Sequence, residues 1–232
     1  MFTRSTAYYD ALYDMKDYAA ASARVEELIA AHAPGACRLL DVGCGTGRHL
    51  EHLRERYDVE GLDLDPGMVA RARERLPGVP VHVADMTDFR LPRAFDVVTC
   101  LFSAIAYVGT APAMARAVAR MAEHLRPGGL LLLEPWFTPE AFWADTITAN
   151  HVDRPDLKIA WMYTSRREDL LSVLDIHYMV GTPAGVERFE ERHELGLFTH
   201  EEHLGALRAA GLEARHDPEG LFDRGLYLGV RR

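Results

Sequence analysis

The segment from residue 39 to residue 47 constrains the fold more than any other part of this chain. It reads Leu-Leu-Asp-Val-Gly-Cys-Gly-Thr-Gly, an apolar stretch typical of a strand followed by three glycines at alternate positions. A pattern typical of a helix follows, from Arg48 to about Arg56. A strand that leads into a glycine-rich turn and then a helix is typical of the nucleotide-binding turn of a doubly wound α/β sheet. We therefore predict an α/β fold whose ligand lies against this turn.

The spacing of the glycines and the acid beside them indicate which ligand the turn binds. Gly43, Gly45 and Gly47 form G-x-G-x-G, whereas the dinucleotide fingerprint is G-x-G-x-x-G. Asp41 places a carboxylate inside the motif, where it would repel a pyrophosphate and favour a cationic ligand. S-adenosylmethionine (SAM) carries a sulfonium and an ammonium group and no phosphate. We therefore expect SAM in this turn, and an NAD-dependent oxidoreductase is the alternative from a different class.

A second strand-like segment, residues 59–62, also ends in an acid. Asp63 follows it, about 20 residues after the acid of the first motif, which is the spacing at which a Rossmann acid binds a ribose. The alternative is that an acid here only caps the helix that begins near Pro66. We assign Asp63, with Leu64 beside it, to the ribose and Asp65 to the cap.

Strands and helices alternate through the first 136 residues. Strand-like segments occupy residues 39–42, 59–62, 81–83, 96–102 and 130–133. Helical patterns cover residues 48–56, 66–76 and 111–125. This alternation predicts right-handed crossovers and a mostly parallel, doubly wound sheet with helices on both faces.

The rest of the chain suggests additions to this core within a single domain. Residues 1–34 are expected to form an N-terminal helical lid, and residues 36–136 the ligand-binding core. Residues 137–197 contain β-rich stretches at 157–165, 170–180 and 186–197, which predict an antiparallel insertion. Residues 198–232 should supply a helix that begins with a capping box at Thr199 and a last strand at 225–230.

Composition excludes several classes of function. The net charge is −9 and there is no long basic run, so nucleic acid is an unsuitable partner. The three cysteines lack paired spacing, so neither a disulfide framework nor a metal site is expected, and Cys44 serves as a small residue of the ligand turn. His177, His193 and His200 lack metal-ligand spacing and are expected at polar surfaces. The apolar run at 130–133 is too short to span a membrane, so a cytoplasmic protein is expected.

Taken together, these motifs resemble the class I SAM-dependent methyltransferases, and more narrowly the TDP-3-amino-sugar N,N-dimethyltransferases of macrolide antibiotic pathways. The matching segments are residues 16–18, 41–47, 85–89, 98–103, 134–136, 197–199 and 224–226. The resemblance implies a Rossmann-like seven-stranded sheet, SAM as methyl donor with S-adenosylhomocysteine as product, and a small-molecule acceptor. It is compatible with a monomer or a homodimer. Two positions depart from the family pattern: Tyr107 stands where a histidine is usual, and Asp63 where glutamate is usual.

The resemblance also implies further cofactor contacts. Asp85 and Met86 follow the third strand, where an acid and the next backbone amide meet the adenine; a surface turn is the alternative for Asp85. Leu101 ends the fourth strand and is expected beside the cofactor. Tyr18 is expected to cover the methionine end of SAM.

Candidate catalytic and substrate-binding residues follow the fourth and fifth strands. Tyr107 could orient the nucleophile or accept its proton through water, or it could only pack the core. Trp136 could stack on a substrate, Glu134 could steady an amine, and Arg224 could bind a phosphate of a nucleotide sugar or form a surface salt bridge. The expected reaction is methyl transfer to an amine, driven mainly by positioning. Methylation of another small metabolite on nitrogen or oxygen, and SAM binding without catalysis, are the alternatives.

Overall fold

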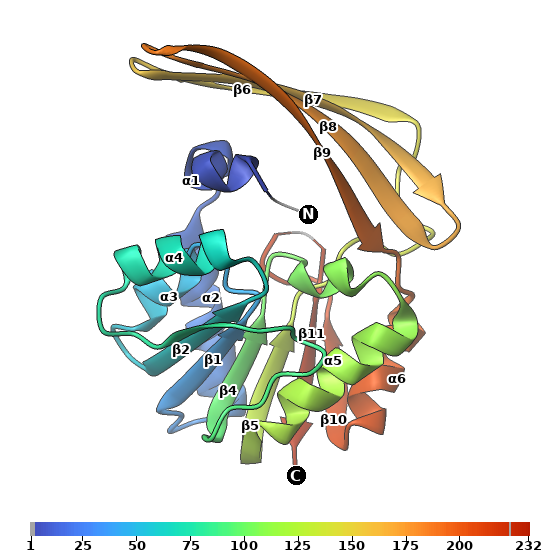
Figure 1. Ribbon diagram of the computed structural model, residues 1–232. Helices are drawn as coiled ribbons and strands as arrows, with labels where there is room; N and C mark the ends of the chain where they lie inside the picture. The colour runs from blue at the N-terminus through green and yellow to red at the C-terminus, as the bar shows by residue number, and fades with distance from the viewer. Residues whose placement is uncertain (1–2, 223) are drawn as a thin grey trace.

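A computed structural model describes residues 3–222 and 224–232. Seven strands form one sheet, and a separate four-stranded sheet arches over one edge of it (Figure 1). The strands of the large sheet, in their order across it, are β10 (Leu212–Asp217), β11 (Leu226–Arg231), β5 (Leu125–Leu133), β4 (Phe95–Cys100), β1 (Arg38–Val42), β2 (Asp58–Asp63) and β3 (Val81–Val83). The five strands from β5 to β3 are parallel, and β11 is antiparallel to both of its neighbours. The predicted α/β fold with a mostly parallel seven-stranded sheet is confirmed.

Helices pack on both faces of this sheet, as Figure 1 shows. One face carries α2 (Tyr18–His32), α3 (Arg48–Leu53) and α4 (Pro66–Arg75). The other carries α5 (Ala111–Glu123) and α6 (His200–Ala209). Successive side chains of a strand point to opposite faces, so Leu39 joins the first layer of core residues and Leu40 the second. The near-continuous apolar runs of the central strands are explained by burial on both sides.

The four-stranded sheet corresponds to the predicted insertion. It is fully antiparallel, in the order β6 (Thr146–Arg154), β7 (Leu157–Glu168), β8 (Leu171–Thr182) and β9 (Gly185–Gly196). Sequence analysis predicted three of these strands and missed β6. No residue of β6 is fully buried, because it is an edge strand, so its sequence carries little of the apolar alternation that reveals a strand. The edge strand β10 was missed for the same reason, since of its residues only Leu212 is buried.

The N-terminal segment, defined as residues 3–17, lies between the two sheets. It holds the short 3-10 helix η1 (Ser5–Tyr8) and the single turn α1 (Tyr9–Leu12), and α2 begins only after a break at residues 13–17. The prediction of helix throughout residues 1–34 is therefore wrong at this break, and its first two residues lie outside those described. Asp17 caps α2 by accepting a hydrogen bond from Ala20 N, which explains where the longer helix begins.

The C-terminal helix begins as predicted. Thr199 Oγ1 accepts from Glu202 N at 3.2 Å and the Glu202 carboxylate accepts from Thr199 N at 2.7 Å, which completes the capping box. In the part of the chain that the structure describes, no helix combines the length and apolar character needed to span a membrane.

Gly61 and Gly205 provide a matched pair that tests this packing. A Cβ on Gly61 would lie 2.7 Å from Leu50 Cδ1 and 2.9 Å from Cys44 Sγ, whereas a Cβ on Gly205, exposed in α6, would meet nothing. Gly61→Ala should lower the free energy of unfolding by about 1–3 kcal/mol through overpacking. Gly205→Ala should raise it by about 0.5–1 kcal/mol through helix propensity. Urea unfolding of both variants checks this, and equal effects would contradict the packing described for β2.

Candidate functional site

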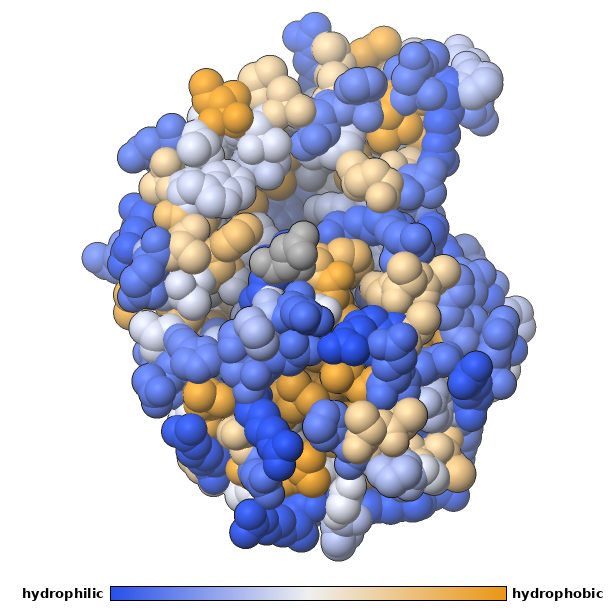
Figure 2. Space-filling model, turned by 180° about the vertical axis from the view of Figure 1, so that it is seen from behind, coloured by the Kyte–Doolittle hydropathy of each residue, from blue (hydrophilic) through white to orange (hydrophobic). Residues whose placement is uncertain are grey.

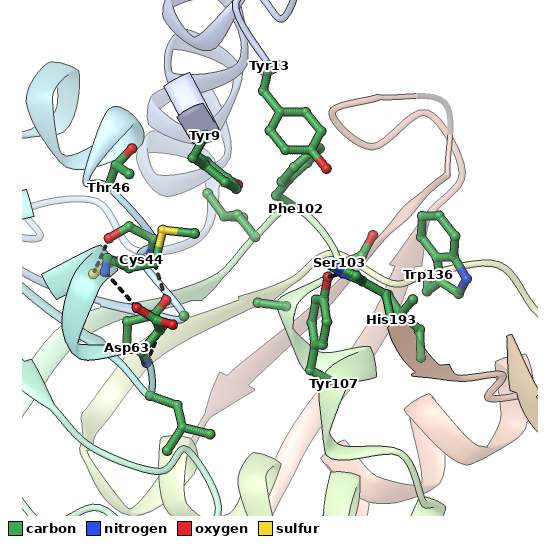
Figure 3. Close-up of a pocket in the computed structure, with 18 of the residues that line it drawn as sticks. Tyr9, Tyr13, Cys44, Thr46, Asp63, Phe102, Ser103, Tyr107, Trp136 and His193 are labelled. Atoms are coloured by element: carbon green, nitrogen blue, oxygen red, sulfur yellow. Dashed lines mark hydrogen bonds between the residues drawn. The ribbon is translucent and has the colours of Figure 1, made fainter. Parts of the chain in front are cut away.

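A cavity of about 590 Å³ lies at the carboxyl ends of the parallel strands, under the four-stranded sheet (Figure 3). Seen from behind, the surface is hollowed between the four-stranded sheet and the body below it (Figure 2). Most of the residues predicted for binding or catalysis line this cavity: Tyr18, Asp41, Gly43, Cys44, Gly45, Asp63, Leu64, Asp85, Met86, Leu101, Tyr107, Trp136 and Arg224. Gly47 and Glu134 do not line it. The carboxyl edge of a parallel sheet is where ligands bind in open α/β folds.

The glycine turn needs its first glycine because another element approaches it closely. Gly43 has φ of +74°, and a Cβ there would lie 2.6 Å from the Cβ of Ala104 in the 3-10 helix η2 (Ala104–Val108). The backbone amides of Gly43 and Cys44 both donate to Leu62 O, at 2.8 and 3.0 Å. The turn is thus fixed to the end of β2 and packed against η2. Gly47 caps α3 and packs against α4, so it supports the turn from outside the cavity.

Asp63 joins the glycine turn to the start of α4. Its Oδ2 accepts from Gly45 N and its Oδ1 from Asp65 N, both at 2.9 Å, while Asp65 caps α4 by accepting from Met68 N, as predicted. Burial raises the pKa of Asp63 above its ordinary value. Each carboxylate oxygen has a further lone-pair site, so Asp63 can also accept the two hydroxyls of a ribose.

Asp41 provides a second carboxylate, which is buried beneath the turn. Its Oδ1 accepts from Thr99 Oγ1 at 2.8 Å, and burial raises its pKa to about 7. Within the described residues, neither Asp41 nor Asp63 has a Lys or Arg ion-pair partner, so a bound cation would stabilise both. Arg48, which also lines the cavity, has a buried Nε without a partner among the described residues and is suited to a carboxylate. A ligand with a sulfonium, an ammonium and a carboxylate fits this set of groups.

Asp85 forms a local turn, which was the alternative to adenine binding in the sequence analysis. It also lines the cavity. Its Oδ1 accepts from Thr87 N at 2.7 Å and Thr87 Oγ1 at 2.8 Å, which closes a local turn. Met86, next to it, also lines the cavity. We keep the assignment of these two residues to the adenine as a proposal.

The N-terminal segment and the start of α2 contact the glycine-turn side of the cavity. Asp10 accepts from Thr46 Oγ1 at 2.6 Å and pairs with Arg75, which links α1 to the glycine turn and to α4. Tyr18 stacks edge-on against His49 and lies under the Arg48 guanidinium, 4.8 Å from the ring centre. The segment therefore covers the glycine turn.

Tyr9 and Tyr13, which sequence analysis did not propose as ligands, also line the cavity. The helical spacing of apolar and aromatic residues shows that one face of a helix is covered. It does not show whether the protein core or a ligand covers that face. The repeated choice of tyrosine, whose polar end needs a partner, is the signal that could have identified them.

Glu134 occupies a different place from the one predicted. It is fully buried and accepts from Phe102 N through Oε2 at 2.6 Å and from Arg224 Nη2 through Oε1 at 2.9 Å. Phe102 and Ser103 have φ of +53° and +60°, a strained conformation for residues other than glycine. Glu134 thus stabilises the turn after β4 and does not face a substrate. Arg224 forms an ion pair, which was the alternative to phosphate binding in the sequence analysis. Its partner is the buried Glu134.

Tyr107 meets a histidine that sequence analysis placed elsewhere. Its Oη lies 2.8 Å from Nδ1 of His193 on β9. Figure 3 shows the two side chains next to each other. The expectation that His193 lies at a polar surface is wrong, because its side chain is buried and lines the cavity. Only the folding of the insertion over the core brings it there. His177 and His200 are exposed, as predicted, and the described residues contain no cluster suited to a metal ion.

The cavity continues under the four-stranded sheet. The inner face of that sheet contributes mainly aromatic and aliphatic side chains, together with one amide: Asn150, Trp161, Tyr163, Leu174, Ile176, Tyr178 and Leu195. None of these was predicted to bind a ligand, because alternation shows which residues share a face but not what that face covers.

Comparison with known proteins gives concordant matches. The methyltransferase domain family matches residues 39–129. The dTDP-3-amino-3,4,6-trideoxy-α-D-glucopyranose N,N-dimethyltransferase of Streptomyces venezuelae is 41% identical over 217 residues, covering 93% of this chain and 92% of that protein. The crystal structure of DesVI from the same organism has a TM-score of 0.94 at 38% identity and covers all of both chains. SAM-bound CalS10 from Micromonospora echinaspora, described as an amino pentose methyltransferase, has a TM-score of 0.89 at 41% identity, covering 100% of this chain and 98% of that one.

Asp63→Ala should weaken SAM binding at least about 100-fold while leaving the fold intact. Two hydrogen bonds from ribose hydroxyls to a carboxylate are worth about 1.5–3 kcal/mol each. Calorimetric titration with SAM measures the loss, and circular dichroism verifies the fold. Asp58→Ala, at the opposite and exposed end of β2, is the control and should change the Kd less than twofold. Unchanged affinity in Asp63→Ala would refute the ribose assignment.

Proposed function

Because this chain belongs to the SAM-dependent methyltransferases, in the family of the dTDP-amino-sugar N,N-dimethyltransferases, we propose that it methylates the amino group of a nucleotide-linked amino sugar. That it is a methyltransferase also excludes the dehydrogenase alternative. Bound SAM supplies a methyl group made electrophilic by its sulfonium. The residues proposed to hold SAM are Tyr18, Asp41, Gly43, Cys44, Gly45, Arg48, Asp63, Leu64, Asp85, Met86 and Leu101.

A cationic and aromatic corner of the cavity supports a nucleotide-linked substrate. Lys16 Nζ lies 4.0 Å from the ring centre of Phe102, and the Arg224 guanidinium lies 5.7 Å from that of Trp136. Arg224 Nε and Trp136 Nε1 are buried and have no hydrogen-bond partner among the described residues. Two cations and two donors without partners suit the oxygens of a pyrophosphate. The ion pair with Glu134 uses only one nitrogen of Arg224 and fixes its position.

The cavity has one group of residues for SAM and another for the acceptor, which supports methyl transfer by positioning of the two ligands. Asp41 and Asp63 lie at one end, and Lys16, Trp136 and Arg224 line the same cavity. The N-terminal segment and the four-stranded sheet cover it, which would exclude water while donor and acceptor are held in line. This continuous cavity, with carboxylates for a cation and cations for phosphates, is the observation that carries the proposal.

A screen of acceptors tests the proposal directly. Purified enzyme with labelled SAM should methylate dTDP-linked amino sugars and should not methylate the corresponding free amino sugars at comparable rates. Methylation of free amines alone, or of hydroxyl acceptors alone, would overturn the proposed substrate while leaving the methyltransferase assignment in place.

Lys16 gives the phosphate site a distinctive pH dependence. Burial, together with the nearby Arg224 guanidinium, lowers the pKa of Lys16 to about 8. The ammonium is therefore charged below pH 8 and neutral above it. We expect the calorimetric Kd for dTDP, which has no amine to titrate, to rise as the pH increases from 7.5 to 9.5.

Lys16→Met keeps the apolar stem of the side chain and removes the charge. It should weaken dTDP binding about 10-fold at pH 7.5, the value of one charge-assisted hydrogen bond. The Kd of the variant should also change little with pH. Thymidine, which lacks phosphates, is the control ligand and should bind both proteins alike. A variant that retains the wild-type pH dependence would contradict the phosphate site.

A further inference from the structure

A buried carboxylate, Glu134, supports one corner of the cavity from outside. We name this corner the phosphate corner and define it as Lys16, Phe102, Trp136 and Arg224, all of which line the cavity. Glu134 is fully buried and does not line the cavity. Its Oε1 accepts from Arg224 Nη2 at 2.9 Å, and its Oε2 accepts from Phe102 N at 2.6 Å. One group outside the cavity therefore holds two residues that line it.

The bond to Glu134 fixes Arg224 and leaves much of its guanidinium for an anion. The bond uses Nη2, whereas Nε is buried and has no hydrogen-bond partner among the described residues. The guanidinium also lies 5.7 Å from the ring centre of Trp136 and 6.0 Å from those of Phe102 and Phe137. A planar guanidinium that is held at one nitrogen keeps its other N–H groups in a fixed plane, which suits a phosphate.

The other oxygen of Glu134 holds the turn that carries Phe102. Phe102 and Ser103 have φ of +53° and +60°, so this turn needs support from its surroundings. The Glu134 carboxylate accepts from Phe102 N, and Pro135 O accepts from Ser103 Oγ at 2.6 Å. The Phe102 ring that is held in this way lies 4.0 Å from Lys16 Nζ, a cation–π contact. Glu134 therefore also determines the surface on which Lys16 rests.

The charge of Glu134 also favours the protonated form of Lys16. Burial and the Arg224 guanidinium lower the pKa of Lys16 to about 8, and the Glu134 carboxylate opposes this shift. His49, which is also near Lys16, is neutral at neutral pH because burial lowers its pKa to about 3. Since Glu134 and Arg224 compensate each other, Lys16 supplies the net positive charge of the phosphate corner.

We propose that Glu134 is a positioning residue for the acceptor: it holds Arg224 and Phe102 where the phosphate corner binds the pyrophosphate of a nucleotide-linked sugar. This inference rests on the proposed function, because it requires an acceptor with phosphates. Without the buried anion, Arg224 and Lys16 would repel each other, and burial would favour loss of the lysine proton. Glu134 touches neither the acceptor nor SAM, so it determines which acceptors bind and leaves the transfer step to other residues.

Glu134→Gln tests this role because the amide keeps the shape of the side chain and one acceptor oxygen. That oxygen can still accept from Phe102 N, whereas the NH₂ group meets the donors of Arg224. At pH 7.5 the calorimetric Kd for dTDP should rise about 10-fold, the effect of misplacing one charge-assisted hydrogen bond. The KM for a dTDP-amino sugar should rise in proportion, while kcat and the Kd for SAM change by less than about twofold.

Combination with Arg224→Gln separates positioning from a general structural effect. If Glu134 acts through Arg224, the double variant should bind dTDP no more weakly than Arg224→Gln alone. Losses that multiply in the double variant would overturn the proposal. The double variant has two neutral amides and no unpaired buried charge, so it remains available for measurement if Glu134→Gln alone does not fold.

Glu213→Gln is the matched control. Glu213 also accepts from two arginines, Arg215 at 2.8 Å and Arg232 at 3.0 Å, but it does not line the cavity or contact the phosphate corner. This variant should match the wild type in its Kd for dTDP and in KM. Wild-type affinity for dTDP in Glu134→Gln, or an equal loss of SAM and dTDP binding, would overturn the positioning role.

The lysines give a readout that needs neither dTDP nor SAM. The chain has two lysines, Lys16 and the exposed Lys158, so carbon NMR of lysine-labelled protein should show two titrating side chains. Lys16 should lose its proton at a lower pH in Glu134→Gln than in the wild type, and at a lower pH in the double variant than in Arg224→Gln. The titration of Lys158 should stay the same in all of them.

The two readouts distinguish failure of this inference from failure of the proposed function. If the wild type binds dTDP and the titration of Lys16 is unchanged by Glu134→Gln, the positioning role is overturned and the proposed substrate stands. If the wild type binds no dTDP and methylates no nucleotide-linked amino sugar, the proposed function fails, and the role of Glu134 in recognising the acceptor fails with it.

Discussion

The hydrogen bonds that Asp63 accepts at the end of β2 are the interaction on which the rest of the site depends. One carboxylate receives the amide of Gly45 from the glycine turn and the amide of Asp65 at the start of α4. It therefore fixes the end of one strand, the turn that follows another and the beginning of a helix. Because it is half-buried and has no Lys or Arg partner among the described residues, it is also a charge that a cationic ligand would stabilise. The same group thus organises the site and favours its proposed ligand.

Buried carboxylates recur wherever separate segments meet around the cavity. Glu134 joins the turn after β4 to Arg224, and Glu191 joins the N-terminal segment to the four-stranded sheet. In each case backbone amides or charged donors satisfy the carboxylate, which is what makes its burial tolerable. Removing Glu134 or Glu191 would leave unpaired donors in the interior and loosen one wall of the cavity. These polar contacts add to the apolar packing of Leu12 against the four-stranded sheet, so both kinds of contact hold the walls of the cavity.

Features that depend on residues close together in the sequence were predictable from the sequence. The glycine turn, the cap at Asp65 and the capping box at Thr199 depend on spacing along a short segment, and the structure has each of them where the sequence predicted it. Strands β6 and β10 were missed because edge strands lack a continuous apolar pattern. Glu134 was predicted to steady an amine, but its carboxylate accepts from Phe102 N and Arg224, because proximity to a site in sequence does not reveal what a side chain contacts.

By itself the sequence determined the doubly wound core, the cationic character of its ligand and the elements that carry it, because these follow from periodicity and from charges within a few residues of one another. The tertiary structure alone decided the far half of the cavity: that His193 contacts Tyr107, that Tyr9 and Tyr13 line the cavity, and that the inner face of the insertion covers it. Those contacts join residues many positions apart along the chain. Their existence depends on how one sheet lies over another, and no local pattern of residue types records that arrangement.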